Sequence, residues 1–172
     1  MSTHWKSDEQ LLSLIKSELF SAVVGDVMDQ MDLRHQFLPP QIVPLKDHMV
    51  VAGRAMPLLV QDTDYDPEVP FNEAYGLLFD ALDNLKANEV YICTGASPEY
   101  ALWGELMSTR AMKLGAVGAV VDGYSRDTPG ILDLDFPTFS YGGYAQDQAY
   151  RGKVVDYRVP INISGVNIAP GD

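Results

Sequence analysis

Residues 90–127 have the sequence VYICTGASPEYALWGELMSTRAMKLGAVGAVVDGYSRD, and this stretch decides the fold. Val90 to Cys93 has the composition of a buried strand, Tyr100 to Leu114 carries apolar residues at helical spacing, and Val117 to Val121 is a second apolar strand. Gly115 directly follows the last apolar residue of the helix, as a C-terminal cap does. We therefore expect a right-handed β-α-β unit with parallel strands. One face of its helix is formed by Leu106, Met107, Arg110, Ala111 and Leu114.

The carboxyl edge of such a sheet is where ligands bind. The loop DGYSRD follows the second strand and brings Asp122, Arg126 and Asp127 to this edge. The backbone amides at the start of the helix lie at the same edge, and Gly104 has no side chain to block a ligand.

This combination suits a small anionic substrate and a hard divalent cation, because amides and a guanidinium bind negative oxygens while carboxylates bind the cation. From the residues alone, the favoured alternative is that these side chains have no role in binding a ligand. In it, Arg126 and Asp127 form an exposed loop pair, and Glu105 is a first-turn carboxylate favoured by the helix dipole.

The N-terminal half predicts three helices and one strand. Ser7 and Gln10 form a capping-box pattern before a first helix, and Ser21 is the expected cap of a second. Residues 49–60 predict a strand or bent strand pair around Gly53. The remaining segments are an acidic loop from Asp62 to Pro70, interpreted as solvated and not as a calcium site, and a third helix from Phe71 to Leu85.

The C-terminal part is rich in short β segments. FPTFSYGG (136–143) and GKVVDYRVPINISGVNIAPGD (152–172) contain glycine and proline between apolar residues. They predict a second, more antiparallel sheet layer.

Composition narrows the function classes. The 172 residues, 47% of them hydrophobic, predict one globular domain over residues 1–172. The formal net charge of -12 argues against nucleic acid and anionic membrane surfaces as partners. The first ten residues, MSTHWKSDEQ, lack the apolar core of a signal peptide, and no apolar run reaches the length of a membrane span. We expect a cytoplasmic protein.

The segment from Trp103 to Asp127 resembles the signature of the RraA-like family, in which a glycine and an acidic residue precede an Arg-Asp pair by about twenty residues. The resemblance covers nearly the whole chain. It extends to SAVVGDVMDQM (21–31), QFLPPQIVPL (36–45), VVAGRA (50–55), FPTFSYGG (136–143) and VPINISGVNIAPGD (159–172).

The resemblance implies a layered α/β/β/α sandwich of the swivelling-domain type with a parallel β-α-β unit at its centre. It also implies a metal-dependent aldolase that cleaves 4-hydroxy-4-methyl-2-oxoglutarate or a related oxo acid to pyruvate, and that decarboxylates oxaloacetate through the same enolate. In this reading Gly104, the amides of Leu106 and Met107 and the side chain of Arg126 bind the substrate. Asp127 ligates Mg²⁺ or Mn²⁺, and Glu105 contacts metal-bound water and helps to move the proton.

Two departures from the family pattern accompany the resemblance. The motif continues after Arg-Asp with two residues and then Glu or Asp, whereas this chain has Gly130 at that place. Aldolases of the family also continue beyond the position of Asp172 with further strands, an acidic segment and a helix. The resemblance implies a homotrimer, or a hexamer, in which a neighbour's C-terminal segment donates an acidic residue to the site. We therefore expect this sequence to be a shortened chain with an open strand edge at its end.

Two other functions are weighed against the lyase. The family's namesake regulators bind a ribonuclease without catalysis, and the Arg126–Asp127 pair argues against that function because a protein-binding module needs no metal ligand beside an arginine. A methyltransferase is disfavoured because no Gly-x-Gly-x-Gly turn follows a strand.

Overall fold

The computed structural model describes residues 5–172, so the first four residues of the N-terminal stretch lie outside the described part. Two helices begin the described chain, α1 (Asp8–Glu18) and α2 (Ser21–Gln30). Ser7 caps α1 as predicted, because its side chain accepts a hydrogen bond from the amide of Gln10. The predicted cap at Ser21 is wrong: Ser21 is the first residue of α2, and the extended residue Phe20 precedes it without a side-chain cap.

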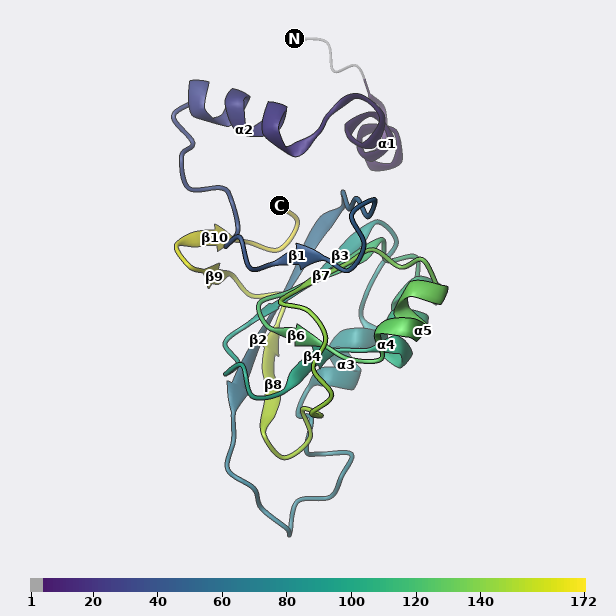
Figure 1. The fold of residues 1–172 in the computed structure, drawn as a ribbon, viewed down its shortest axis with the longest axis vertical. Coiled ribbons are helices and arrows are strands. Elements are labelled where there is room, and N and C mark those ends of the chain that lie inside the picture. The colour runs from purple at the N-terminus through teal and green to yellow at the C-terminus, as the bar shows by residue number, and fades with distance from the viewer. Residues whose placement is uncertain (1–4) are drawn as a thin grey trace.

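A six-stranded sheet organises the rest of the molecule (Figure 1). Its strand order is β1-β7-β5-β3-β2-β8. The four inner strands are parallel, and β1 and β8 are antiparallel edge strands. The bounds are β1 (Val43–Pro44), β2 (Arg54–Asp62), β3 (Glu89–Thr94), β5 (Gly118–Val121), β7 (Thr138–Ser140) and β8 (Gly152–Tyr157).

The predicted β-α-β unit is confirmed at the centre of this sheet. Strands β3 and β5 are parallel, with Val90 opposite Gly118, and α4 (Glu105–Lys113) connects them. Gly115 follows the helix with a φ of +85°, and its amide donates to the carbonyl of Met112 as in a C-terminal cap.

The predicted start of this helix is wrong. Residues Ala101–Trp103 form a short strand, β4, which pairs in parallel with β6 (Tyr124–Ser125), and the helix begins only at Glu105. All three residues of β4 are buried, so side chains on both sides of an extended segment have apolar surroundings. Leu106, predicted to lie in the apolar stripe, is instead 80% exposed.

The third helix is shorter than predicted. Only α3 (Leu78–Asp83) is helical, and the segment from Phe71 to Tyr75 forms turns. Gly76 explains the break, since it has a φ of +61° and pairs with Val154 so closely that a Cβ would lie 2.4 Å from the Val154 carbonyl oxygen.

The two faces of the main sheet are covered differently (Figure 1). Helices α3, α4 and α5 (Thr128–Asp133) lie on one face, and the antiparallel hairpin β9 (Ile161–Ile163) and β10 (Val166–Ile168) packs on the other. Helices α1 and α2 lie together at the end of the molecule, in contact with residues 50–54. The mixed α/β class with a parallel-rich sheet is confirmed. The predicted second layer is smaller, because residues 138–140 and 152–157 join the main sheet as β7 and β8.

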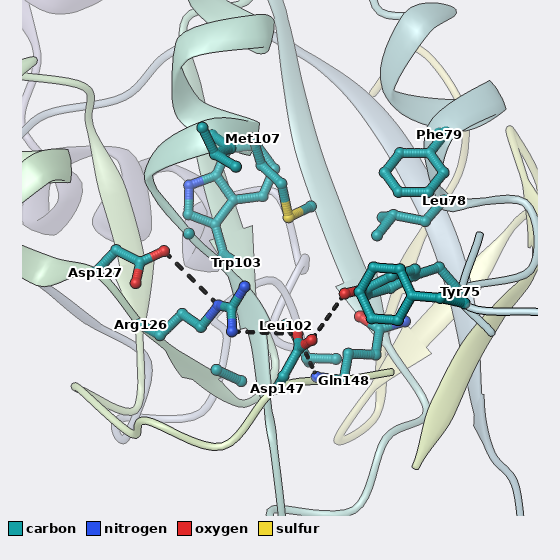
Figure 2. Close-up of a pocket in the computed structure, with 14 residues that line it drawn as sticks. Tyr75, Leu78, Phe79, Leu102, Trp103, Met107, Arg126, Asp127, Asp147 and Gln148 are labelled. Atoms are coloured by element: carbon teal, nitrogen blue, oxygen red, sulfur yellow. Dashed lines mark hydrogen bonds and ion pairs between the residues drawn. The ribbon is translucent and has the colours of Figure 1, made fainter. Parts of the chain in front are cut away.

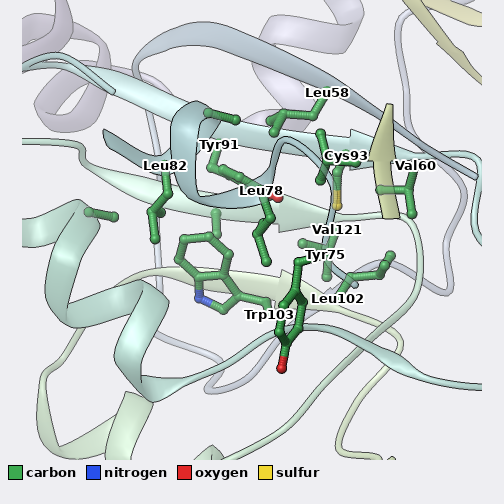
Figure 3. Packing of buried hydrophobic residues seen from close by; sticks show 14 of the residues in the cluster. Leu58, Val60, Tyr75, Leu78, Leu82, Tyr91, Cys93, Leu102, Trp103 and Val121 are labelled. Atoms are coloured by element: carbon green, nitrogen blue, oxygen red, sulfur yellow. The ribbon is translucent and has the colours of Figure 1, made fainter. Parts of the chain in front are cut away.

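The larger core lies between the main sheet and the helices, and Figure 3 shows part of it. The ring of Trp103 stacks on Phe136 with centroids 6.0 Å apart and contacts Tyr91 at 4.7 Å. Its indole N–H donates to Ser108 Oγ over 2.7 Å, so the buried polar atom is satisfied. This packing fixes β4 and the start of α4 relative to the sheet.

In the described part of the chain, β10 pairs with β9 alone, so its second edge has no partner strand. The last two residues contact the main sheet, because the amide of Gly171 donates to the carbonyl of Ala55 and the amide of Ala55 donates to the carbonyl of Asp172. Among residues 5–172, no helix has the length and apolar character needed to cross a membrane.

Candidate functional site

The structure brings the predicted residues together at the start of α4. The backbone amide of Arg126 donates to the carbonyl of Trp103, which fixes the loop after β6 beside the N-cap residue Gly104. A Cβ at Gly104 would lie 2.7 Å from Asp127 Oδ2 and 3.4 Å from Arg126 Cγ. The absence of a side chain at Gly104 therefore leaves room for the Asp127 carboxylate in this position, while the backbone of Gly104 is itself extended.

The first turn of α4 presents free backbone amides. The N–H of Ser108 is the first to donate to a helical carbonyl, that of Gly104 at 3.0 Å. The amides of Leu106 and Met107 precede this bond and therefore have no partner within the helix. The Glu105 amide points toward Asp127 Oδ2, 3.4 Å away. A negative oxygen placed at this turn also gains from the helix dipole.

Asp127 is held in an unusual backbone conformation. It precedes α5 with φ and ψ of 56° and 34°, in the left-handed region that non-glycine residues rarely adopt. Its side chain is 43% exposed and that of Arg126 is 36% exposed. Both are therefore accessible to a ligand while their backbones are fixed by neighbouring strands and helices.

The guanidinium of Arg126 lies between two carboxylates without a close bidentate pair (Figure 2). Its Nε lies 3.7 Å from Asp127 Oδ2, and its Nη1 lies 3.3 Å from Asp147 Oδ1. Within residues 5–172 its side chain makes these ion pairs but no hydrogen bond that meets the usual geometry. Several N–H donors of Arg126 thus stay available for a ligand.

A cavity of about 300 Å³ opens beside these groups. Figure 2 shows Asp127 and Arg126 at one end of it, Asp147 next to Arg126, and Tyr75, Leu78 and Phe79 at the other end. The lining is mostly apolar. Its members are Phe71, Tyr75, Leu78, Phe79, Ala101, Leu102, Trp103, Gly104, Leu106, Met107, Arg126, Asp127, Asp147 and Gln148.

Glu105 occupies the space that Gly130 leaves open. A Cβ at Gly130 would lie 2.2 Å from Glu105 Oε2 and 2.6 Å from its Cγ. The place where the family motif has a carboxylate is thus adjacent to the carboxylate of Glu105. Because Gly130 lacks the side chain that the family motif has here, the Glu105 side chain can lie in that space.

Asp147 and Tyr75 were not identified from the sequence. The Tyr75 hydroxyl donates to Asp147 Oδ2 over 2.7 Å, and burial together with this bond raises the pKa of Tyr75. Asp147 lies in the segment after β7, whose carboxyl end is at the same sheet edge as that of β5. That topology was the available signal, but β7 was assigned to the wrong layer.

Asp122 does not line the cavity. It accepts hydrogen bonds from Thr94 Oγ1 and Tyr141 Oη, both at 2.6 Å, and so serves the packing of the loops after β3 and β7. Gly143 and Tyr144 border a separate depression on the other side of Arg126 and Asp127.

The carboxylates of the site suit a weakly ligated Mg²⁺ or Mn²⁺. Among the described residues no group of three His, Cys, Asp or Glu side chains is placed to hold a metal ion. Mg²⁺ commonly binds through one or two carboxylates and keeps several waters, and the half-exposed Asp127 supplies one such carboxylate. The Glu105 carboxylate lies against Gly130 and does not line the cavity.

Comparison with known protein families identifies one match. The family description RraA-like, Aldolase/RraA, matches residues 21–172. Protein DlpA of Legionella pneumophila is 27% identical over 153 residues, which are 88% of this chain and 24% of DlpA. The chain thus spans about a quarter of the length of this curated relative.

Solved structures show the same fold. A structure described as novel cellulases from microbes associated with the gut ecosystem has a TM-score of 0.87 and 28% identity, and covers 100% of this chain and 76% of its own. Streptomyces coelicolor RraAS2, described as an unusual member of the RNase ES inhibitor RraA family, has a TM-score of 0.80 at 22% identity, over 97% of this chain and 81% of its own.

Proposed function

The chain belongs to the RraA-like family, and on that premise we propose that it is a divalent-metal-dependent carbon–carbon lyase. Its substrate is a 4-hydroxy-2-oxo acid, such as 4-hydroxy-4-methyl-2-oxoglutarate, which it cleaves to pyruvate by a retro-aldol reaction. Oxaloacetate decarboxylation follows through the same pyruvate enolate. Because the family description covers both aldolases and RraA proteins, the proposal rests on the site and not on the fold.

One observation carries the proposal. Arg126 has N–H groups that make no hydrogen bond within residues 5–172, and they lie beside the free amides of the first turn of α4 and the half-exposed carboxylate of Asp127. Its two ion-pair distances of 3.3 and 3.7 Å leave the guanidinium open to a ligand. A chain with a net charge of -12 repels anions, so an anionic substrate needs a local cation, and Arg126 supplies one at the cavity.

The residues divide the chemistry between them. The amides of Leu106 and Met107 and the guanidinium of Arg126 bind the carboxylate and the oxo group of the pyruvyl unit. Arg126 also stabilises the negative charge that develops on the enolate oxygen when the carbon–carbon bond breaks. Glu105 holds or moves the proton that the C4 hydroxyl loses, through water.

Asp127 is the residue that would hold Mg²⁺ or Mn²⁺, with Glu105 contacting the water around the ion. The bound ion would supply Lewis-acid polarisation of the oxo group. Gly104 contributes by leaving room for the Asp127 carboxylate, because a Cβ there would lie 2.7 Å from Oδ2 and the carboxylate would have to move.

A non-catalytic regulator that binds a ribonuclease or another protein is the second candidate. The observation in its favour is a set of exposed apolar side chains before, on and after α2, namely Phe20, Val27, Met31 and Phe37, which are 48–65% exposed. The same surface also suits the homotrimer or hexamer that we propose for the lyase.

A panel of oxo acids separates these functions. Pyruvate release from oxaloacetate and from 4-hydroxy-2-oxo acids is measured with Mg²⁺ and with a chelator. The lyase releases pyruvate above the protein-free background only with the metal, whereas a pure binding protein releases none above that background under either condition. Release that is equal with and without the chelator would contradict the metal-dependent mechanism.

A further inference from the structure

Asp147 faces the guanidinium of Arg126 on the side away from Asp127. Figure 2 shows one row of polar contacts that runs from Asp127 through Arg126 and Asp147 to Tyr75. The contacts shorten along this row, from 3.7 Å between Asp127 and Arg126 to 3.3 Å between Arg126 and Asp147, and to 2.7 Å at the Tyr75 hydroxyl. Arg126 thus lies closer to Asp147 than to Asp127, its neighbour in the chain.

The carboxylate of Asp147 is fixed at both of its oxygens. Oδ2 accepts a hydrogen bond from the Tyr75 hydroxyl over 2.7 Å, and Oδ1 accepts one from the backbone amide of Gln148 over 2.8 Å. The residue that supplies the hydroxyl is itself buried, since Tyr75 is 9% exposed. A buried hydroxyl and a backbone amide therefore determine where Asp147 presents its charge to Arg126.

The two sides of this ion pair are attached to the same short strand, β4. The amide of Ala101 in β4 donates to the carbonyl of Gln146, which directly precedes Asp147. The amide of Arg126 donates to the carbonyl of Trp103, at the other end of β4. The separation between Asp147 and Arg126 is thus set by the backbone and not by the flexible side chains alone.

This anchoring matters because a free arginine beside an aspartate forms a closer pair. Guanidinium and carboxylate groups approach to about 2.7–2.9 Å and often bind through two parallel N–H···O contacts. Arg126 and Asp127 lie 3.7 Å apart, so a small rotation would close that pair. A closed pair would occupy both the Asp127 oxygens and the Arg126 donors. Asp147 opposes the closure because it attracts the guanidinium from the other side.

We propose that Asp147 is a positioning residue that keeps the guanidinium of Arg126 apart from Asp127. Asp127 then stays free for a divalent cation, and Arg126 stays free for an anionic ligand. This inference rests on the proposed function, because the two groups that are kept apart are its metal ligand and its substrate-binding cation. Asp147 itself contacts neither the ion nor the substrate in this role.

Binding of Mn²⁺ measures the role without any turnover. The ion is titrated into the full chain, and electron paramagnetic resonance counts the unbound Mn²⁺. Asp147→Asn keeps the size of the side chain and removes its charge. We expect its dissociation constant for Mn²⁺ to rise, because Arg126 closes on Asp127. An unchanged dissociation constant would overturn the inference, and so would a wild-type chain that binds no Mn²⁺.

Loss of a negative charge weakens cation binding by itself, so the same substitution is also made without the arginine. Arg126→Gln removes the group that Asp147 is proposed to hold. In this background the effect of Asp147→Asn should be at least about threefold smaller than in the wild-type background, because only the contribution of the charge is left. Equal effects in the two backgrounds would show that Asp147 acts through its charge or through the fold, which overturns the inference.

A second substitution guards against a variant that does not fold. Asp147→Ser has a smaller side chain that still accepts a hydrogen bond, and circular dichroism compares the fold of every variant with that of the wild type. The same dependence on Arg126 is expected. Its absence in whichever of the two Asp147 variants is folded contradicts the positioning role.

Asp133→Asn is the matched control. It removes the same charge from an exposed position of α5, the helix that begins directly after Asp127. Its effect on the dissociation constant for Mn²⁺ should be small and the same with and without Arg126. A dependence on Arg126 as large as that of Asp147→Asn would contradict the assignment to Asp147.

Pyruvate release separates this inference from the proposed function. Release by the wild-type chain with Mg²⁺, together with equal effects of Asp147→Asn in the two backgrounds, supports the lyase and refutes the role of Asp147. A larger effect in the wild-type background, together with no release from any oxo acid of the panel, supports the role of Asp147 and refutes the lyase.

Discussion

Two arginines of this chain have opposite surroundings. Arg158, in the connection from β8 to β9, forms a bidentate pair with Glu89, with Nη1–Oε1 and Nη2–Oε2 distances of 2.7 and 2.9 Å, and it also donates twice to Asn84. Arg126 makes two ion pairs, at 3.3 and 3.7 Å, and retains free donors. The pairing with Glu89 raises the pKa of Arg158 further above its usual range.

The difference separates a structural cation from one that binds ligands. Arg158 donates four hydrogen bonds to groups of its own chain, so its contribution is to folding. Arg126 lies among carboxylates that are too far away to occupy its donors, next to amides that also lack partners. A site of this kind is stable only because the surrounding strands and the Trp103 core fix its backbone.

The largest expected effect is at the metal ligand. Asp127→Ala should abolish oxaloacetate decarboxylation, because it removes the only carboxylate proposed to bind the ion directly. The fold should be retained with a small loss of stability, because alanine tolerates the left-handed backbone at this position less well than aspartate does. Decarboxylation at the wild-type rate with added Mg²⁺ would show that the metal assignment is wrong.

Arg158→Ala should produce the largest loss of stability. Glu89, whose side chain is 11% exposed, would be left without its partner, and removal of one member of a largely buried pair costs about 3 kcal/mol. Urea unfolding followed by circular dichroism gives the change in the free energy of unfolding. The turnover of the folded fraction should stay close to that of the wild type; a specific loss of turnover without a loss of stability would reverse the roles of the two arginines.

Arg126→Lys should reduce turnover by roughly tenfold or more, since an ammonium group cannot reproduce the planar contacts to carboxylate and enolate oxygens. Its free energy of unfolding should change little. Steady-state kinetics and urea unfolding of the same preparation check both statements. A near-wild-type rate would make Arg126 an ordinary surface charge.

The smallest effect concerns a carboxylate outside the site. Hydrogen bonds from the Ser97 amide and the Tyr100 hydroxyl outweigh partial burial and lower the pKa of Asp62 below its usual 3.8. A lowered folded-state pKa stabilises the fold above the unfolded value, and this contribution disappears as the pH falls through the folded value.

Asp62→Asn should therefore lose less than about 1 kcal/mol at pH 7, because Asp62 is exposed to solvent, and the difference from the wild type should shrink as the pH falls below 3.8. Thermal unfolding from pH 7 to pH 3 measures this difference. A difference that is constant over the whole range would indicate that ionisation of Asp62 has no part in stability.

The sequence predicts the structure correctly where the local pattern of residues and the long-range packing favour the same conformation. The strands around Val90 and Val120 are continuous apolar runs, and their parallel pairing was predicted correctly. The proximity of Gly104, Arg126 and Asp127 followed from the topology of one β-α-β unit. These residues lie within one contiguous segment, so few alternatives had to be excluded.

Prediction failed where a distant contact overrides local spacing. Leu102 and Trp103 fit a helical pattern but form β4, because β6 and the core around Phe136 bury them on both sides. Residues after Phe71 fit a helix until Gly76 meets β8. Asp147 joins the site only through the position of β7 in the main sheet, which the spacing of short β segments does not specify.

The central claim is that Arg126 and Asp127 form a site that stabilises the enolate of pyruvate. Exchange of the pyruvate methyl protons for deuterium, followed by proton NMR in deuterated water, measures this step without any choice of aldol partner. We predict exchange with Mg²⁺ for the wild type and for Arg158→Lys, and none above background with a chelator or for Asp127→Ala. Absence of exchange in the wild type with Mg²⁺, or equal exchange in Asp127→Ala, would contradict the account.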